Sequence, residues 1–227
     1  MYPPPAGSVL YLSGYPPLGA TITDHSGQSN HGTITGATWT KLSSGLWCLD
    51  FDGTNDNITT GVNNFTFGTG DITVKFWICP DAFGGGSKYP FVYNLNDSGA
   101  QGTESMEGFS NDNGKISINF RTSGGVAKVA ESNVLTLGAW THIVGARISN
   151  TVYGYEKGEA FPTTAVAGAD FNYANPSAFM IGSLIGNVNA TYSVDGKLVL
   201  LTILKGVGWT TAQALNNFNQ ERHLFRI

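Results

Sequence analysis

Two pairs of acidic residues have a spacing that bears on sugar hydrolysis. Glycoside hydrolases place two carboxyl groups about 5 to 9.5 Å apart around the bond that they cleave. Glu104 and Glu107 are three residues apart, which on a strand directs their side chains to opposite faces, and the surrounding Gly, Ser and Asn favour a solvated loop. Asp50 and Asp52 alternate correctly, but they flank apolar residues that would face a core, so both carboxylates would point away from it. Neither pair predicts a catalytic site.

Other catalytic signatures are absent from the sequence. It contains no G-x-S-x-G elbow, no Walker loop, no dinucleotide fingerprint and no Cys/His spacing typical of zinc sites. His142 lies at the expected start of a strand, so we interpret it as a structural residue rather than a base. The sequence therefore predicts a protein that is not an enzyme.

Several tyrosines are suited to a different chemistry, the binding of sugars. The C–H face of a pyranose stacks on an aromatic ring, while its hydroxyl groups need directional hydrogen-bond partners. We expect some of the tyrosines in or beside loops and edge strands to be exposed for this purpose. The candidates are Tyr89, Tyr93, Tyr153, Tyr155, Tyr173 and Tyr192. The strand face that carries Tyr89 and Tyr93 would fit a core as well as a binding surface.

The composition narrows the class of protein and of partner. Of the 227 residues 12% are charged, about half the ~25% usual for soluble domains, and the 30 glycines indicate many turns. The glycines follow no G-X-Y period and argue against collagen and a helical bundle. With 41% apolar residues there is enough to pack a core, which excludes disorder. A net charge of -4 argues against nucleic acid as a partner.

The sequence shows no targeting segment. The N-terminal stretch MYPPPAGSVLYLSGYPP lacks a basic region followed by an apolar one, so we expect no secretory signal. No stretch approaches 18 apolar residues, which predicts no membrane insertion. Cys48 and Cys79 are too few for a disulfide framework, and without a signal we expect free thiols.

Short strands separated by turn residues predict an all-β fold. A sheet of eleven or more strands normally closes or splits, so the pattern indicates two packed antiparallel sheets. Trp77 and Trp140 are expected to pack between these sheets. The expected strands cover residues 31–40, 46–52, 56–60, 72–79, 89–95, 115–122, 126–131, 140–149, 151–156, 178–182 and 196–204.

One short helix and an extended arm complete the expected organisation. Thr210 and Gln213 form a capping box at the start of the helix, and Leu215 and Phe218 would give it an apolar face. The three consecutive prolines within residues 1–7 predict an extended N-terminal arm. Because no linker separates two cores, residues 8–227 are predicted to form a single domain.

Several segments, taken in order, carry a resemblance to a known family. They are ITDHSGQSNHGTITGATW (22–39), LDFDGTNDNITT (49–60), FTFGTGDITVKFWICP (65–80), AWTHIV (139–144), and the stretch from SVDGKLVLLTIL to the final helix. Together they resemble the laminin-G-like, concanavalin A-like jelly-roll domains over residues 22–222. The resemblance implies a jelly-roll sandwich. It leaves function open, since this fold hosts lectins, glycosidases and structural parts.

The resemblance also implies a structural calcium ion, because related sandwiches often carry one where N-terminal loops meet the last strand. Calcium takes six to eight oxygen ligands. Asp24, Asp52 and Asp195 are the residues in this sequence that would contribute carboxylates. The alternative is that all three serve turns and strand ends.

These observations together predict a non-catalytic recognition or adhesion module that binds a glycan or a protein surface. Members of the family occur in secreted, cell-surface and bacteriophage proteins. With no signal visible, we expect a protein assembled in a cytoplasm or on a virion, such as a capsid-decorating or tail-associated protein displayed outside the cell, whose arm docks on other virion proteins. A glycoside hydrolase or polysaccharide lyase of the same fold, and a purely structural assembly protein, stay open as alternatives.

Overall fold

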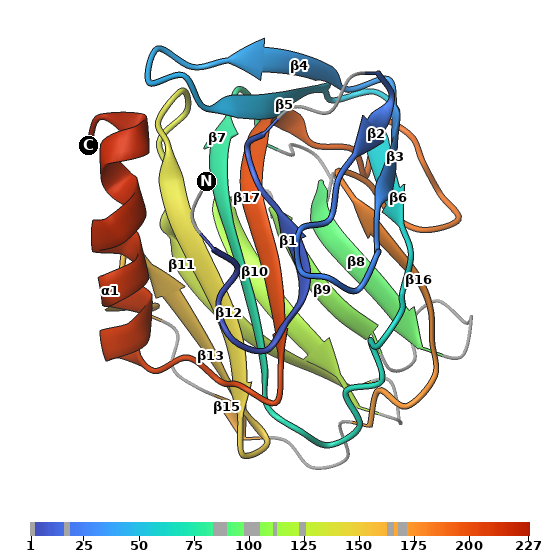
Figure 1. Ribbon diagram of the computed structural model, residues 1–227. Helices are drawn as coiled ribbons and strands as arrows, with labels where there is room; N and C mark the ends of the chain where they lie inside the picture. The colour runs from blue at the N-terminus through green and yellow to red at the C-terminus, as the bar shows by residue number, and fades with distance from the viewer. Residues whose placement is uncertain are drawn as a thin grey trace.

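The computed structural model shows a two-sheet antiparallel β-sandwich with a helix near the C-terminus (Figure 1). This confirms the predicted fold class. The structure describes residues 3–15, 19–83, 90–97, 105–110, 113–122, 126–162, 166–167 and 172–227, without the side chains of 96–97 and 166–167.

Sheet A runs in the order β14-β13-β12-β7-β17-β5-β4, with β1 beside β17 and β15 beside β13. All its pairs are antiparallel. Its strands are β1 (Ser8–Leu12), β4 (Thr38–Lys41), β5 (Trp47–Asp52), β7 (Ile72–Pro80), β12 (Thr141–Ile148), β13 (Thr151–Glu156), β14 (Glu159–Ala160), β15 (Val166–Ala167) and β17 (Asp195–Lys205).

Sheet B runs in the order β11-β10-β9-β8-β16-β6-β3-β2 and is also antiparallel. Its strands are β2 (Thr21–Ile22), β3 (Gly32–Thr35), β6 (Asn57–Thr60), β8 (Phe91–Asp97), β9 (Ser105–Ser110), β10 (Lys115–Arg121), β11 (Ala127–Val134) and β16 (Pro176–Ile181).

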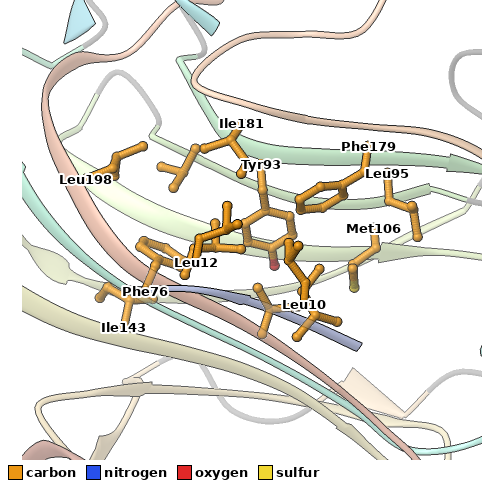
Figure 2. Close-up of a cluster of buried hydrophobic side chains, with 14 of the residues drawn as sticks. Leu10, Leu12, Phe76, Tyr93, Leu95, Met106, Ile143, Phe179, Ile181 and Leu198 are labelled. Atoms are coloured by element: carbon orange, nitrogen blue, oxygen red, sulfur yellow. The ribbon is translucent and has the colours of Figure 1, made fainter. Parts of the chain in front are cut away.

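The inner faces of the two sheets enclose the core. Side chains alternate along each strand, so Ile116, Ile118 and Phe120 of β10 point inward and the residues between them point outward. Figure 2 shows Tyr93 and Phe179 of sheet B packed with Phe76 of sheet A. This alternation decides which polar residues of sheet B lie on its outer face.

The expected single strand over residues 31–40 was wrong, because the chain changes sheets within it. Strand β3 belongs to sheet B and β4 to sheet A. Between them Gly36 has a φ of 80°, and a Cβ atom there would lie 1.8 Å from Oδ1 of Asp56. Only glycine fits this crossing point.

Five strands lie outside the expected ranges: the two-residue strands β2, β14 and β15, and the longer strands β1 and β9. Strand β1 pairs with the C-terminal half of β17, and the residues before it make the arm. Strand β9 lies between β8 and β10, in the region expected to be a solvated loop. The sequence of β9 predicted a loop because it contains Gly and Ser, which are typical of turns.

Helix α1 (Thr211–Glu221) continues into a short 3₁₀ turn, η1 (Arg222–Phe225), and both pack on the outer face of sheet A (Figure 1). The predicted capping box is confirmed, with Gln213 Oε1 accepting the Thr210 N–H at 2.9 Å. The expected apolar face was partly wrong, because Leu215 is 43% exposed and the helix buries Ala214 instead. No helix that the structure describes is long and apolar enough to span a membrane.

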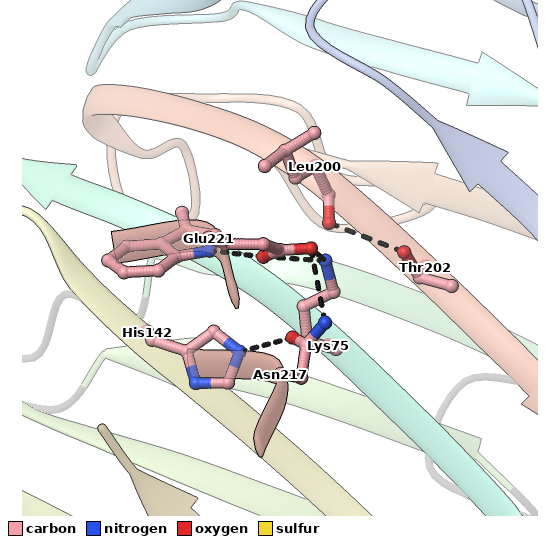
Figure 3. Close-up of polar contacts among 7 residues, drawn as sticks. Lys75, His142, Leu200, Thr202, Asn217 and Glu221 are labelled. Carbon is pink, nitrogen blue, oxygen red and sulfur yellow. Dashed lines mark hydrogen bonds and ion pairs between the residues drawn. The ribbon is translucent and has the colours of Figure 1, made fainter. Parts of the chain in front are cut away.

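A buried polar cluster holds this helix on sheet A, and we refer to Glu221, Lys75, Trp77, Asn217 and His142 as the Glu221 cluster (Figure 3). Glu221 accepts from Lys75 Nζ at 2.8 and 3.0 Å, from Trp77 Nε1 at 2.6 Å and from Asn217 Nδ2 at 3.2 Å. Nε2 of His142 lies 2.9 Å from Oδ1 of Asn217. Every carboxylate oxygen of Glu221 therefore has at least two donors.

The environment of this cluster shifts two pKa values. Burial alone would raise the pKa of Glu221, but the Lys75 ammonium group and the hydrogen bonds lower it below its usual value. Burial lowers the pKa of His142 to about 4, and Lys75 adds to that effect. The expected structural role of His142 agrees with its complete burial against Trp77.

The placement of two tryptophans corrects a prediction. Trp77 is fully buried, but it stacks on Phe225 of η1 at 4.0 Å between ring centroids, and Trp140 lies 4.8 Å from the same ring. Both therefore lie under the C-terminal segment on the outer face of sheet A, not between the sheets. Strand β7 is buried on both faces, so alternation could not tell which side an aromatic residue takes.

Candidate functional site

The outer face of sheet B carries a buried glutamate at its centre. Glu107 lies in β9 next to Met106, which points into the core, so the Glu107 side chain points away from it. The residues paired with Glu107 are Asn94 in β8 and Asn119 in β10. All three are at most 5% exposed.

The carboxylate of Glu107 is held by neutral donors. Its Oε1 accepts from Ser105 Oγ at 2.7 Å and from Asn94 Nδ2 at 3.5 Å. Its Oε2 accepts from Asn119 Nδ2 at 2.9 Å. We call these residues, together with Arg121, the Glu107 cluster.

Two acceptors in the Glu107 cluster have no hydrogen-bond partner among the described residues. They are Oδ1 of Asn94 and Oδ1 of Asn119, the amide oxygens opposite the groups that bind Glu107. A buried acceptor without a donor costs about 1 to 3 kcal/mol, so native proteins rarely leave one unless a ligand or an ordered water supplies the donor. Each of the two amide oxygens therefore has capacity for a further hydrogen bond.

Arg121 connects the cluster to solvent. Its Nε lies 3.5 Å from Oε1 of Glu107, and its side chain is 30% exposed. Farther along the same face, Ser117 Oγ donates to Oε1 of Glu131 at 3.2 Å. A guanidinium group beside a carboxylate presents several N–H donors in a plane, which suits recognition of oxygen-rich ligands.

The cluster is supported from beneath by Tyr173. The Tyr173 hydroxyl lies 3.0 Å from the carbonyl oxygens of both Ser105 and Arg121, and so ties β9 to β10. The guanidinium group of Arg147 lies over the Tyr173 ring at 5.3 Å and donates to the carbonyl oxygens of Gly68 and Gly70. These contacts fix the strands that carry the site.

Gly108, next to Glu107, has a packing reason to be glycine. A Cβ atom there would lie 2.3 Å from Cε1 of Tyr93, whose ring covers the glycine from the core side. Burial raises the pKa of Tyr93, and its hydroxyl has no partner among the described residues. The ring thus approaches the β9 backbone closely at the centre of the site.

An aromatic group lies beside the polar cluster on the same face. Phe109 follows Glu107 by two residues and pairs with Phe91 in β8, with ring centroids 5.4 Å apart. Tyr192 lies 6.0 Å from Phe91. Phe109 and Tyr192 are half-buried, so part of each ring faces solvent. On this face of sheet B, the buried carboxylate and amides therefore lie near a partly exposed guanidinium group and half-buried aromatic rings.

The structure separates the tyrosines that were predicted to bind sugar. Tyr93 and Tyr173 are 0% exposed, so the prediction that they contact ligand was wrong: both rings belong to the core, in which Figure 2 shows Tyr93. Tyr155 is 3% exposed and packs beneath α1, and Tyr153 is half-buried against the same cluster. Tyr192 is the candidate that the structure brings to the site, and Tyr89 lies outside the described residues.

Of the two glutamates that the sequence analysis considered as a catalytic pair, the structure describes one. Glu104 lies outside the described residues. Glu107 was expected in a solvated loop, and this was wrong, because β9 places it in the sheet with neighbours from strands on both sides. The alternation of Ser105, Glu107 and Phe109 with Met106 and Gly108 was the signal that could have revealed the strand.

The three aspartates predicted to bind calcium do not all share one set of contacts. Asp24 accepts from the backbone N–H groups of Tyr11, Ser26 and Asn30, each at 2.9 Å, and so braces a loop against β1. Asp52 and Asp195 are register partners in β5 and β17. The described residues hold no group of three or more His, Cys, Asp or Glu side chains suited to a metal ion. Calcium binding stays a prediction.

Burial of Asp195, followed by the charges of Asp81, Asp50 and Asp52, raises its pKa. Lys197 offsets this charge, with Nζ 2.6 Å from Asp81 and 3.5 Å from Asp50. Cys48 and Cys79 lie on β5 and β7, on either side of β17, and both are free and buried.

Sequence comparison assigns the family. The concanavalin A-like lectin/glucanases superfamily, in its laminin-G-like branch, matches residues 52–207. The chain belongs to this family. No curated protein matches the sequence.

Solved structures agree on the fold. The binding domain of Paraclostridial Mosquitocidal Protein 1 is 15% identical, with a TM-score of 0.74, over 94% of this chain and 52% of that one. The receptor-binding domain of botulinum neurotoxin mosaic serotype C/D is 13% identical, with a TM-score of 0.72, over 95% and 51%. A Trypanosoma rangeli sialidase in complex with sialic acid is 14% identical, with a TM-score of 0.72, over 100% and 35%. The chain thus spans about half or less of each protein.

Proposed function

We propose that this chain is a non-catalytic recognition module and that it binds a glycan on the outer face of sheet B at the Glu107 cluster. The observation that supports this most is the buried Glu107 carboxylate between two asparagines whose amide oxygens have no donor in the part of the chain that the structure describes. A sugar hydroxyl group both donates and accepts a hydrogen bond, so it can satisfy such an acceptor directly or through an ordered water.

The neighbouring groups suit the rest of a sugar. The half-buried rings of Phe109 and Tyr192 offer apolar surface for pyranose C–H groups, and the partly exposed Arg121 places a guanidinium group beside the Glu107 carboxylate. The names of the similar structures also mention receptor binding and sialic acid. We extend this property to the present chain as part of the proposal.

Binding is favoured over hydrolysis because no described residue places a second carboxylate next to that of Glu107. Its described contacts are amides, a hydroxyl group and one guanidinium group. The next acid on this face, Glu131, is two strands away in β11, a separation of about 10 Å before the offset along the strand is added. Its Oε1 also accepts from Ser117. A general acid and its partner need closer placement.

The experiment pairs a glycan array with a polysaccharide-depolymerisation assay on the full chain. We expect retention on at least one glycan class without new reducing ends. Glu107→Gln and Arg121→Ala should each weaken retention about tenfold, since each removes a charged hydrogen-bonding partner. Arg222→Ala is the matched control, because Arg222 is an exposed arginine in η1, beside α1. New reducing ends, or retention that ignores both changes, would overturn the proposal.

We also propose that the module is part of a virion or of a similar assembled surface. The arm supports it: Pro3 and Pro4 are exposed, while the Gly7 carbonyl accepts from Lys205 N–H at 2.9 Å and anchors the arm's base. The arm is thus free to contact a neighbouring subunit. If deletion of residues 1–7 left co-assembly with virion proteins unchanged, this part would fail.

A further inference from the structure

A separate hollow lies beside η1 on the outer side of sheet A. Its volume is about 330 Å³, and its walls come from the segment after β1, the β4–β5 turn, β17 and η1. Pockets for small ligands start near this size, and an apolar cavity of about 150 Å³ suffices to bind benzene. The Glu107 cluster contributes no residue to it.

The lining of the hollow is neutral and mainly apolar. Leu46, Leu200 and Leu224 form its walls, and no charged side chain contributes. Tyr15, which also lines it, is 64% exposed, a large aromatic surface left in water. A neutral, mainly apolar ligand would cover that ring and gain the free energy of removing apolar surface from water.

One polar atom of the lining needs a partner. Ser13 is 4% exposed, and its Oγ has no hydrogen-bond partner among the described residues. A buried hydroxyl group without a partner is costly, and the usual explanation is a ligand or an unseen water. Among the buried side chains that line the hollow, Ser13 has a polar atom without a described partner, so it would orient a ligand by one hydrogen bond.

The backbone is strained where β17 meets this hollow. Leu200 has a φ of 56°, and the register of β17 against β7 shifts between Val199 and Thr202. The left-handed conformation costs a non-glycine residue about 1 to 2 kcal/mol. The bulge turns Leu200 outward to the hollow while Leu201 faces the core. Strain of this kind is concentrated at functional sites.

We infer that this hollow is a binding site for a small neutral molecule with an apolar body and one hydrogen-bonding oxygen, which pairs with Ser13. The inference does not rest on the proposed glycan site. It uses a different sheet, different residues and a different ligand chemistry.

Three probes of one ring size test the chemistry: phenol, toluene and benzoate. Their binding is followed through the methyl NMR signals of Leu46, Leu200 and Leu224. We expect phenol to bind about fivefold more tightly than toluene, the usual effect of one hydrogen bond, and benzoate to bind most weakly because no cation lines the hollow. No shift with any probe up to its solubility limit, or benzoate binding as tightly as phenol, would overturn the inference.

Two variants locate the binding. Ser13→Ala should abolish the advantage of phenol over toluene without changing toluene binding. Leu224→Trp should fill the hollow and prevent both from binding, whereas Leu215→Trp should not, because Leu215 is an exposed leucine of α1 outside the hollow. If Leu224→Trp fails to fold, the Ser13→Ala comparison still decides: an unchanged preference for phenol would contradict the inference.

Discussion

Glu107 and Glu221 are both buried glutamates that lie on the outer face of a sheet, yet their surroundings differ. Both are 5% exposed. Glu221 meets a buried lysine, an indole N–H and an amide, so its charge and its lone pairs are satisfied within the chain. Glu107 meets amides, a hydroxyl group and the partly exposed Arg121 guanidinium group, and the oxygens of both amides have no donor among the described residues.

This difference separates a structural role from a binding role. A buried ion pair with all its hydrogen bonds made leaves nothing for a ligand to add, and its geometry fixes α1 on sheet A. A buried carboxylate among incompletely satisfied amides has capacity for further donors. Variants of the residues around Glu221 and Glu107 test whether the first glutamate stabilises the fold and the second binds a ligand.

The largest effect should follow from Glu221→Ala. This change leaves the Lys75 ammonium group, 1% exposed, without its counter-charge, which typically costs about 3 to 5 kcal/mol. Urea denaturation followed by tryptophan fluorescence measures it. The double variant Lys75→Met/Glu221→Leu should recover most of the loss, since no buried charge is left. A double variant as unstable as the single one would argue against a pair-specific role.

Acidification should weaken the same cluster. The pKa of His142 is about 4 in the folded protein against an ordinary 6.5, so between these values the unfolded chain binds more protons than the folded one. We therefore expect the contribution of a neutral His142 to the free energy of unfolding to be fully present above about pH 6.5 and to fall by on the order of 3 kcal/mol toward pH 4. The lowered pKa of Glu221 adds a further loss below its usual range. In denaturation curves measured over this window, His142→Gln should remove most of the slope.

Two buried tyrosines give a smaller, matched comparison. Tyr173→Phe removes the hydroxyl group that ties Ser105 to Arg121 beneath the Glu107 cluster, so we expect a loss of about 1 kcal/mol and weaker glycan retention. Tyr93→Phe removes a hydroxyl group that has no partner, so stability should stay the same or rise. Equal losses from both variants, by thermal denaturation, would show that Tyr173 does not act through its hydroxyl group.

Much of the fold was predictable from local patterns, and most of the site was not. Alternation in the segment KISINFRT located β10, and Thr210 with Gln213 located the start of α1. The sheet change at Gly36 was missed, because it depends on contact with Asp56, which lies far along the chain. Local sequence carries no information on such a contact.

The candidate site depends more than the fold does on pairing between strands that are far apart in the sequence. Glu107 is a candidate binding residue because β8 and β10 place Asn94 and Asn119 on either side of it. Tyrosine content suggested sugar binding, yet Tyr93 and Tyr173 were needed by the core, where large rings contribute most. Tyr192 was distinguishable only once Phe91 and Phe109 were known to lie beside it.

The most direct test measures unfolding free energy and glycan retention for Glu107→Gln and Glu221→Gln side by side. The asparagines at Glu107 have free amide oxygens that can rotate toward the new amide, so Glu107→Gln should cost under about 1 kcal/mol of stability while weakening retention about tenfold. Glu221→Gln should lower stability by about 3 kcal/mol or more and leave retention by the folded fraction unchanged. The opposite pattern, with retention following Glu221 and stability following Glu107, would contradict the assignment of the two glutamates.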